Sequence, residues 1–158
     1  PVPLGAPRVG HSATRLLDGR VALVGGSTAH TLSHPLGWPA VAQNPAPANL
    51  VLFDPLTSTA SPGPALPRPR LWHSSVLLGN GQLLVVGGLE AGAAGLATSA
   101  DCRRFDPQSG QWSAAAPLPA PRALHGLVGT ADGGALAISG AEVDVAAGSL
   151  AGKLQCWS

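Results

Sequence analysis

The sequence predicts an all-β fold built from repeated groups of four short strands. The chain has 158 residues with 21 glycines and 16 prolines, and residues that break helices so often leave little room for long ones. Three segments repeat one another without a gap, and each holds two short apolar runs joined by a turn. Apolar residues make up 45% of the chain, enough for one ordinary domain with a core.

Each repeat opens with Pro-Arg-x-x-His and closes with a small pair that contains glycine. The copies are "PRVGHSATRLLDGRVALVGG" (7–26), "PRLWHSSVLLGNGQLLVVGG" (69–88) and "PRALHGLVGTADGGALAISG" (121–140). The opening residues recur at identical offsets as Arg8 and His11, Arg70 and His73, and Arg122 and His125. The closing pairs are Gly25–Gly26, Gly87–Gly88 and Ser139–Gly140.

Within each copy the pattern predicts a tight hairpin. The first strands are expected at 11–17, 73–78 and 125–130, and the second at 21–24, 83–86 and 135–138. Between them stand Asp18-Gly19, Asn80-Gly81 and Asp132-Gly133, pairs that tolerate positive φ and close hairpins. The second strands are apolar throughout, which indicates that neighbouring sheets cover both of their faces.

A third and a fourth strand follow in each repeat. "LVLFDP" (50–55) matches "CRRFDP" (102–107), and "LQCWS" (154–158) places Trp157 at the same offset as Phe105. The fourth strand carries Trp112, whereas the first copy has Ala60 at that offset. The glycines of "LEAGAAGLATSA" (89–100) predict a loop between the second and third strands.

Four strands at a period of about 50 residues are typical of the blades of a β-propeller. The order of Arg-x-x-His-Ser, the Asn/Asp-Gly turn, the Gly-Gly pair, Phe-Asp-Pro and Trp resembles the kelch repeat over nearly the whole chain. Ser139 departs from that pattern, and the chain has no tyrosine. The predicted blades are about 7–66, 69–118 and 121–158, the last of them incomplete.

Three blades are fewer than the roughly four to eight of closed propellers. An open stack leaves two sheet edges exposed, and the chain starts at Pro1 instead of Met. We therefore expect a partial propeller, about three blades of a larger ring, completed by further blades of a parent protein or by another chain.

No residue is predicted to be catalytic, to bind a cofactor or to bind a metal. Equivalent histidines in successive blades are spread around a ring and cannot readily converge on one ion. Adjacent Ser and His residues in a strand point to opposite faces, and no helix follows the glycine pairs to form a phosphate loop. Cys102 and Cys156 are expected to be semi-buried thiols, with a bridge or a ligand pair as the alternatives.

Two sets of residues are candidates for partner contacts. The long connection at 27–49 holds His30, His34 and Trp38, and an exposed Trp on a scaffold loop is a good anchor; the alternative is a variable insertion. Arg8, Arg70 and Arg122 form the second set. They would either line one face for an acidic partner or bind backbone carbonyls between blades.

The predicted function is a non-catalytic scaffold for a protein or an acidic peptide. The net charge of +1 and the absence of a long apolar run give no sign of nucleic-acid or membrane binding, and we expect an intracellular, cytoplasmic location. The kelch resemblance implies two enzyme alternatives. One is the C-terminal propeller of an S-adenosylmethionine-dependent wybutosine tRNA methyltransferase. The other is a galactose/glyoxal oxidase-like copper enzyme, which the lack of tyrosine disfavours.

Overall fold

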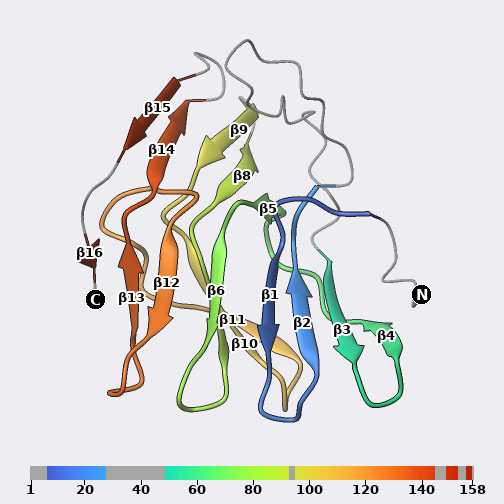
Figure 1. Cartoon of the computed structure of the whole chain (residues 1–158). Helices are drawn as coiled ribbons and strands as arrows, with labels where there is room; N and C mark the ends of the chain where they lie inside the picture. The colour runs from blue at the N-terminus through green and yellow to red at the C-terminus, as the bar shows by residue number, and fades with distance from the viewer. Residues whose placement is uncertain (1–6, 28–48, 93–94, 145–148, 153–155, 158) are drawn as a thin grey trace.

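The computed structural model describes residues 7–27, 49–92, 95–144, 149–152 and 156–157, and every element among them is a β-strand. Figure 1 shows three sheets standing side by side, with a fourth sheet above them. We call the three sheets blade 1, blade 2 and blade 3 in chain order. The first strands of the blades are neighbours, because β1 (Ser12–Arg15) contacts β6 (Ser74–Leu77), which contacts β12 (Gly126–Gly129).

Each blade is an antiparallel sheet. Blade 1 has the order β1-β2-β3-β4, with β2 at Val21–Val24, β3 at Leu50–Asp54 and β4 at Thr59–Pro62. Blade 2 has the order β6-β7-β10-β11, with β7 at Leu83–Val86, β10 at Cys102–Asp106 and β11 at Gln111–Ala114. The described part of blade 3 is β12-β13-β16, with β13 at Ala135–Ile138 and β16 at Cys156–Trp157. The predicted second strands are thereby confirmed residue for residue.

The predicted loop after the glycine pair is wrong. The segment after Gly88 forms a hairpin of β8 (Leu89–Gly92) and β9 (Gly95–Thr98), and the segment after Gly140 forms another. The second hairpin consists of β14 (Ala141–Asp144) and β15 (Ser149–Gly152). Together with β5 (Arg70–Leu71) they make one sheet in the order β15-β14-β9-β8-β5, the upper sheet of Figure 1.

One pairing in this upper sheet joins neighbouring repeats, because Asp144 of β14 lies opposite Ala97 of β9. The strand β8 pairs with β9, and β14 with β15, inside their own repeats. The Oγ1 of Thr98 donates to the carbonyl of Val143 at 2.9 Å and accepts from the amide of the same residue at 2.8 Å. Leu71, Leu89 and Ala123 form a small buried core against it. The glycines within 89–100 are compatible with strands because Gly92 and Gly95 lie opposite each other at the closed end of the β8–β9 hairpin.

The third strand of blade 3 has a register that differs from the expected one. Cys156 lies opposite Ile138 as Cys102 lies opposite Val86, and Trp157 lies opposite Ala137. Trp157 therefore takes the strand position of Arg103, two residues away from the position of Phe105. The cause is the β14–β15 connection, which is two residues longer than the β8–β9 connection.

The glycine pair is the point where one blade meets the next. A Cβ on Gly25 would lie 2.4 Å from the carbonyl oxygen of Arg70, and one on Gly87 would lie 2.5 Å from that of Arg122. The next residues, Gly26 and Gly88, donate their amides to these same two carbonyls at 2.9 Å. The first glycine thus allows the next blade to approach and the second binds it.

A second backbone contact joins the blades one residue before each histidine. The amide of Trp72 donates to the carbonyl of Gly10 at 2.8 Å, and the amide of Leu124 donates to the carbonyl of Trp72 at 3.0 Å. All three residues have positive φ, between 55° and 71°. Of these three residues only Gly10 is of a type that commonly adopts positive φ, so the sequence did not predict this contact.

Candidate functional site

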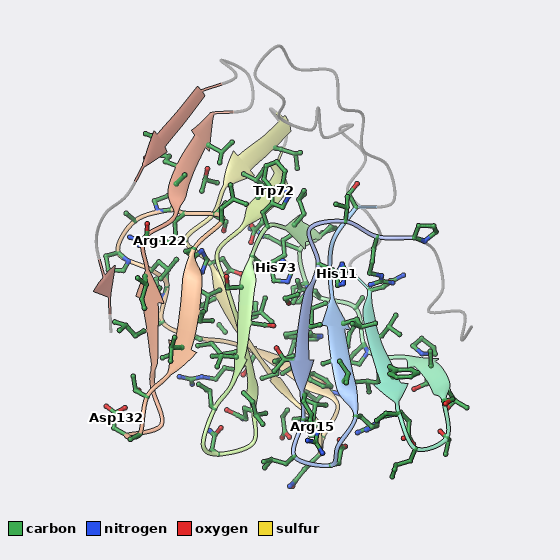
Figure 2. All side chains as sticks on the ribbon, in the orientation of Figure 1. His11, Arg15, Trp72, His73, Arg122 and Asp132 are labelled. Carbon is green, nitrogen blue, oxygen red and sulfur yellow. The ribbon has the colours of Figure 1, made fainter. Side chains whose placement is uncertain are left out.

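The blades have two ends, and the repeated arginines and histidines lie toward one of them (Figure 2). We call the end that carries the glycine pairs and the upper sheet the hairpin end, and the opposite end the turn end. Figure 2 shows His11, His73, Trp72 and Arg122 toward the hairpin end, and Asp132 at the turn end.

Arg70 is buried at the start of blade 2, and its two terminal nitrogens contact residues of the same repeat, whereas its Nε has no hydrogen-bond partner among the described residues. Its NH1 donates to the carbonyls of Gly87 at 3.1 Å and Asp101 at 3.0 Å, and its NH2 donates to the Asp101 carboxylate at 2.6 Å. A charge contact of 2.5 Å joins NH2 to Glu90. The backbone carbonyl of the same residue accepts from Gly26 in blade 1, so Arg70 links the two blades.

Asp101 is the anionic partner that makes this arrangement favourable. Burial would raise the pKa of its carboxyl, but hydrogen bonds from Arg103 and Arg70 hold that pKa below its usual value. The Nε of Arg103 donates to the carboxylate at 2.8 Å. A buried guanidinium that is paired in this way is a structural element, because removing either partner leaves an uncompensated charge.

The other two arginines occupy the same place in their own repeats. Arg122 is buried, and its NH1 donates to the carbonyl of Ser139 at 2.9 Å. Arg8 is half-buried, and its NH1 reaches the carbonyls of Gly25 at 3.3 Å and Asn49 at 3.5 Å. All three side chains therefore bind backbone carbonyls, one of the two roles considered for them; a partner-binding role for them remains a prediction.

The repeated histidines lie in the junctions between blades. The Nε2 of His73 is 2.8 Å from the Oγ of Ser12 in blade 1. Burial, followed by the nearby charge of Arg70, lowers the pKa of His73 to about 3, so the ring is neutral at pH 7. The prediction that adjacent Ser and His cannot pair missed this contact, because the serine comes from the neighbouring blade.

His125 repeats the position of His73 with a different contact. The Oγ of Ser74 in blade 2 donates to the backbone carbonyl of His125 at 2.5 Å. Burial lowers the pKa of His125 to about 4, with Arg122 as the second cause. His11, at the start of blade 1, is exposed. The ring of His73 thus forms a hydrogen bond across the junction, whereas neither ring nitrogen of His125 has a partner among the described residues.

Trp112 and Cys102 are further predicted positions that the structure describes. Trp112 packs on Phe105 with ring centroids 5.1 Å apart, and its Nε1 donates to the carbonyl of Pro64 in blade 1 at 3.1 Å. Cys102 is a buried free thiol whose pKa is raised by that burial. The predicted contact residues His30, His34 and Trp38 lie outside the described residues.

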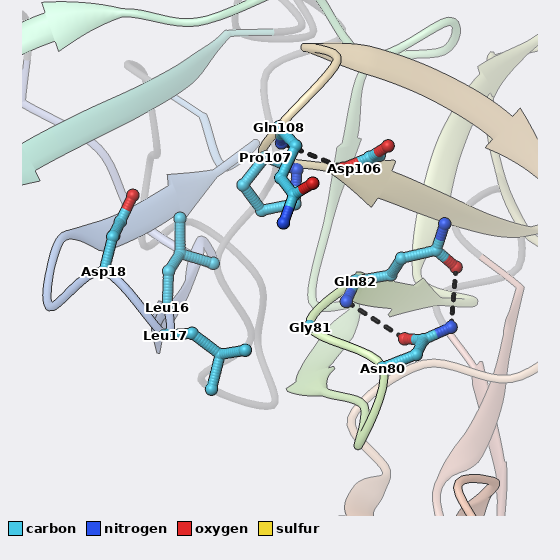
Figure 3. Close-up of a pocket in the computed structure, with 9 residues that line it drawn as sticks. All are labelled: Leu16, Leu17, Asp18, Asn80, Gly81, Gln82, Asp106, Pro107 and Gln108. Carbon is cyan, nitrogen blue, oxygen red and sulfur yellow. Dashed lines mark hydrogen bonds between the residues drawn. The ribbon is translucent and has the colours of Figure 1, made fainter.

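The turn end has a shallow polar pocket of about 260 Å³, which Figure 3 shows in close-up. Asn80 and Gln82 are hydrogen-bonded to each other on one side of it, and the amide of Gln108 donates to Asp106 on the other. These polar groups cap their own turns, as Asp18 does with Arg20. The polar lining of the pocket is therefore explained by the hydrogen bonds that these side chains make within their own turns.

A second cavity of about 230 Å³ lies between blades 2 and 3. Blade 2 lines it with Leu84, Val86 and Cys102, and blade 3 lines it with Ala135 and Ala137. No group of three or more His, Cys, Asp or Glu residues that could hold a metal ion occurs within the described ranges. Nor does any helix in this part of the chain have the length and apolarity to cross a membrane.

Comparison with solved structures supports the fold. The chain is similar to YjhT, a kelch-type β-propeller, with 18% identity over 87% of its length and a TM-score of 0.66. A copper-containing fungal alcohol oxidase of the AA5 family matches 66% of the chain at 20% identity, covering 18% of the oxidase, with a TM-score of 0.46.

The chain spans 35% of the length of YjhT, about a third of that structure. No protein-family model and no curated protein matches the sequence. The repeat, the blade topology and the likeness to YjhT together show an all-β, kelch-type propeller fold, of which the chain forms three blades.

Proposed function

We propose that the chain is a non-catalytic protein-binding module that takes an acidic segment of its partner at the hairpin end. The observation that carries this proposal is the charge of Arg8. Among the described residues its guanidinium contacts two carbonyls, at 3.3 and 3.5 Å, and no carboxylate. An arginine in this state retains its capacity for a carboxylate.

The equivalent position in blade 2 supports a carboxylate as the partner of Arg8. There the equivalent Arg70 is paired with the carboxylates of Asp101 and Glu90. In blade 1 the residue before the third strand is Asn49, in the place of Asp101, so the negative charge is missing. An aspartate or glutamate from a partner would supply that charge.

The surroundings of Arg8 also favour a protein partner. Ser27, where the 27–49 connection leaves β2, exchanges backbone hydrogen bonds with Val9 at 2.8 and 2.9 Å. The connection with its predicted contact residues His30, His34 and Trp38 therefore starts beside Arg8. Loops carried by a rigid scaffold are common recognition elements, and a tryptophan there would add an apolar anchor.

A fluorescein-labelled peptide with six consecutive glutamates is a direct probe. We expect it to bind at low salt and to be released as the salt concentration rises. Arg8→Gln should weaken binding by about three- to fivefold, the effect of one solvent-accessible ion pair. The measurement is fluorescence anisotropy at several salt concentrations.

Arg20→Gln is the matched control, because Arg20 lies at the turn end and is paired with Asp18 at 2.6 Å. Equal weakening by the two variants would show that the peptide responds only to net charge, and would contradict the proposal. The methyltransferase and copper-oxidase alternatives rest on the kelch resemblance alone, since the likeness to YjhT concerns the fold.

A further inference from the structure

The cavity between blades 2 and 3 has an apolar wall. Leu84 and Val86 of β7 form one side of it, and Ala135 and Ala137 of β13 form the other. The two alanines stand where blade 2 has larger residues, Leu and Val, and the shorter side chains leave a volume of about 230 Å³. A buried water needs about two to four polar partners, so this wall suits an apolar guest better than water.

A cation stands at the mouth of this cavity. Arg104 of β10 lies opposite Leu84 of β7, so the two side chains share the face of blade 2 that lines the cavity. Arg104 is also exposed, which places it at the open side. The equivalent residue of blade 1 is Leu52, a buried member of the filled core. An arginine therefore replaces a core leucine at the interface that contains the cavity.

The guanidinium of Arg104 makes no hydrogen bond and no ion pair within the described ranges. The acidic residues at the two ends of its strand have other partners. Asp106 caps its own turn, and Asp101 pairs with Arg70 and Arg103 at 2.6 and 2.8 Å. The capacity of Arg104 for a carboxylate is therefore unused by the part of the chain that the structure describes.

We propose that the cavity between blades 2 and 3 binds an aliphatic monocarboxylate with a chain of about six carbons. The carboxylate pairs with the guanidinium of Arg104, which favours two parallel N–H···O bonds. The chain lies against Leu84, Ala135 and Ala137, where burial removes its methylene groups from water. The volume suits this length, because a cavity of about 150 Å³ already takes up benzene, a six-carbon guest.

Both halves of this ligand are needed to match the cavity. A small inorganic anion would pair with Arg104 but would leave the apolar side chains uncovered. A neutral hydrocarbon would cover those side chains but would leave the guanidinium unpaired. The site is separate from the one proposed for an acidic partner, because Arg8 does not line the cavity. The two proposals therefore succeed or fail independently.

Hexanoate is the probe, and its binding is followed through the ¹H–¹⁵N NMR shifts of the protein amides at pH 7.5. We expect a Kd of about 1–10 mM, which is ordinary for a ligand of eight non-hydrogen atoms. The shifts should be largest around Leu84, Ala135 and Ala137. Acetate, which has the charge without the chain, should bind at least about tenfold more weakly. Hexanol, which has the chain without the charge, should bind at least about threefold more weakly.

Arg104→Gln should weaken hexanoate binding by about three- to fivefold and leave hexanol binding unchanged. Arg15→Gln is the matched control, because Arg15 is also exposed but lies at the turn end and does not line the cavity (Figure 2). It removes the same charge and should leave the binding of both ligands unchanged. Ala137→Val should weaken the binding of both ligands at least about threefold, because its two methyl groups take up cavity volume.

The proposal is overturned if hexanoate at about 50 mM causes no shifts around the cavity, or if acetate or hexanol binds as tightly as hexanoate. It is also overturned if Arg15→Gln weakens hexanoate binding as much as Arg104→Gln, because the ligand would then respond only to net charge. Urea unfolding of each variant checks that it is folded. The comparison of the three ligands uses the unaltered chain, so it tests the proposal even where a variant does not fold.

Discussion

The interface between blades 1 and 2 is filled with large apolar side chains, whereas the interface between blades 2 and 3 contains a half-open cavity. In the first, Leu83, Val85 and Phe105 of blade 2 pack against Val24 and Leu52 of blade 1 in one buried core. In the second, the positions of Leu83 and Val85 are taken by Ala135 and Ala137, which line the cavity of about 230 Å³.

Blade 2 changes its side chains at the second interface as well. Leu50 and Leu52 of blade 1 correspond to Cys102 and Arg104 of blade 2, both of which line the cavity. The backbone contacts are nevertheless the same, because the glycine amides donate to the arginine carbonyls at 2.9 Å in both interfaces. The two interfaces therefore share the backbone contacts that fix the position of each blade. They differ in side-chain volume, which determines how strongly each interface stabilises the fold.

Leu83→Ala should have the largest effect on stability. It removes a fully buried side chain from the filled interface, and such truncations cost about 2–5 kcal/mol. Urea unfolding followed by tryptophan fluorescence measures the loss. Leu84→Ala, one residue along the same strand, faces the cavity and should cost about 1 kcal/mol. Equal losses at the two positions would contradict the difference between the interfaces.

Gly87→Ala should come next, at a cost of about 2 kcal/mol or more. It places a Cβ at a φ of 60° and 2.5 Å from the carbonyl of Arg122. Ser139, at the equivalent position of blade 3, already has a Cβ. Ser139→Ala should therefore change the free energy of unfolding by less than about 0.5 kcal/mol. If Gly87→Ala costs no more free energy of unfolding than Ser139→Ala, the carbonyl of Arg122 moves away from the added Cβ without cost, which would contradict the prediction.

The sequence alone was sufficient for the blades because their information is local. The tight turns and the apolar run 83–86 lie within one repeat, so their spacing predicts the hairpin directly. The upper sheet was missed because the glycines of 89–100 were interpreted as a loop, although Gly92 and Gly95 lie opposite each other in a hairpin within one repeat. Only the pairing of β9 with β14 crosses between repeats. The strand position of Trp157 was also predicted wrongly. The connection before β15 is two residues longer than its counterpart before β9, and a count from the glycine pair assumes equal lengths.

For the candidate site, the sequence located the arginines and left their roles open. Burial separates them, because Arg70 is enclosed and paired with Asp101 whereas Arg8 is half-buried and unpaired with any described carboxylate. One signal was available, namely Asn49 in the place of Asp101. This replacement can be interpreted only when the contact between the arginine and the residue at this position is known. The two residues are 31 positions apart in blade 2 and 41 in blade 1, so only the structure supplies that contact.

Acid should weaken both interfaces through their histidines. The pKa of His73 is lowered to about 3 and that of His125 to about 4, so the unfolded chain takes up protons that the folded chain does not below pH 6.5. Stability is therefore complete above pH 6.5 and falls as the pH drops toward 4. At pH 5.5 each histidine should cost about 1.4 kcal/mol.

His73→Gln tests this dependence. It should lower stability at pH 7.5, because the contact with Ser12 is altered, but it should halve the additional loss between pH 7.5 and 5.5. The measurement is the urea midpoint at the two pH values. An unchanged difference between them would show that burial of this histidine does not set the acid sensitivity.

Ala137→Val should have a small effect, and it should be a gain. Valine is the residue at the equivalent position of blade 2, where Val85 is fully buried, and the two added methyl groups would enter the cavity. We expect the free energy of unfolding to rise by about 1 kcal/mol, as measured by urea unfolding at pH 7.5.

The same substitution in the filled interface gives this result its meaning. Ala22 is fully buried in the core between blades 1 and 2, so Ala22→Val should destabilise the chain by about 1–3 kcal/mol through overpacking. Opposite signs at Ala137 and Ala22 would demonstrate that the two interfaces differ in packing and not in blade geometry. A loss at both positions would mean that the cavity cannot accept side-chain volume, and the difference would then lie in how closely the blades approach.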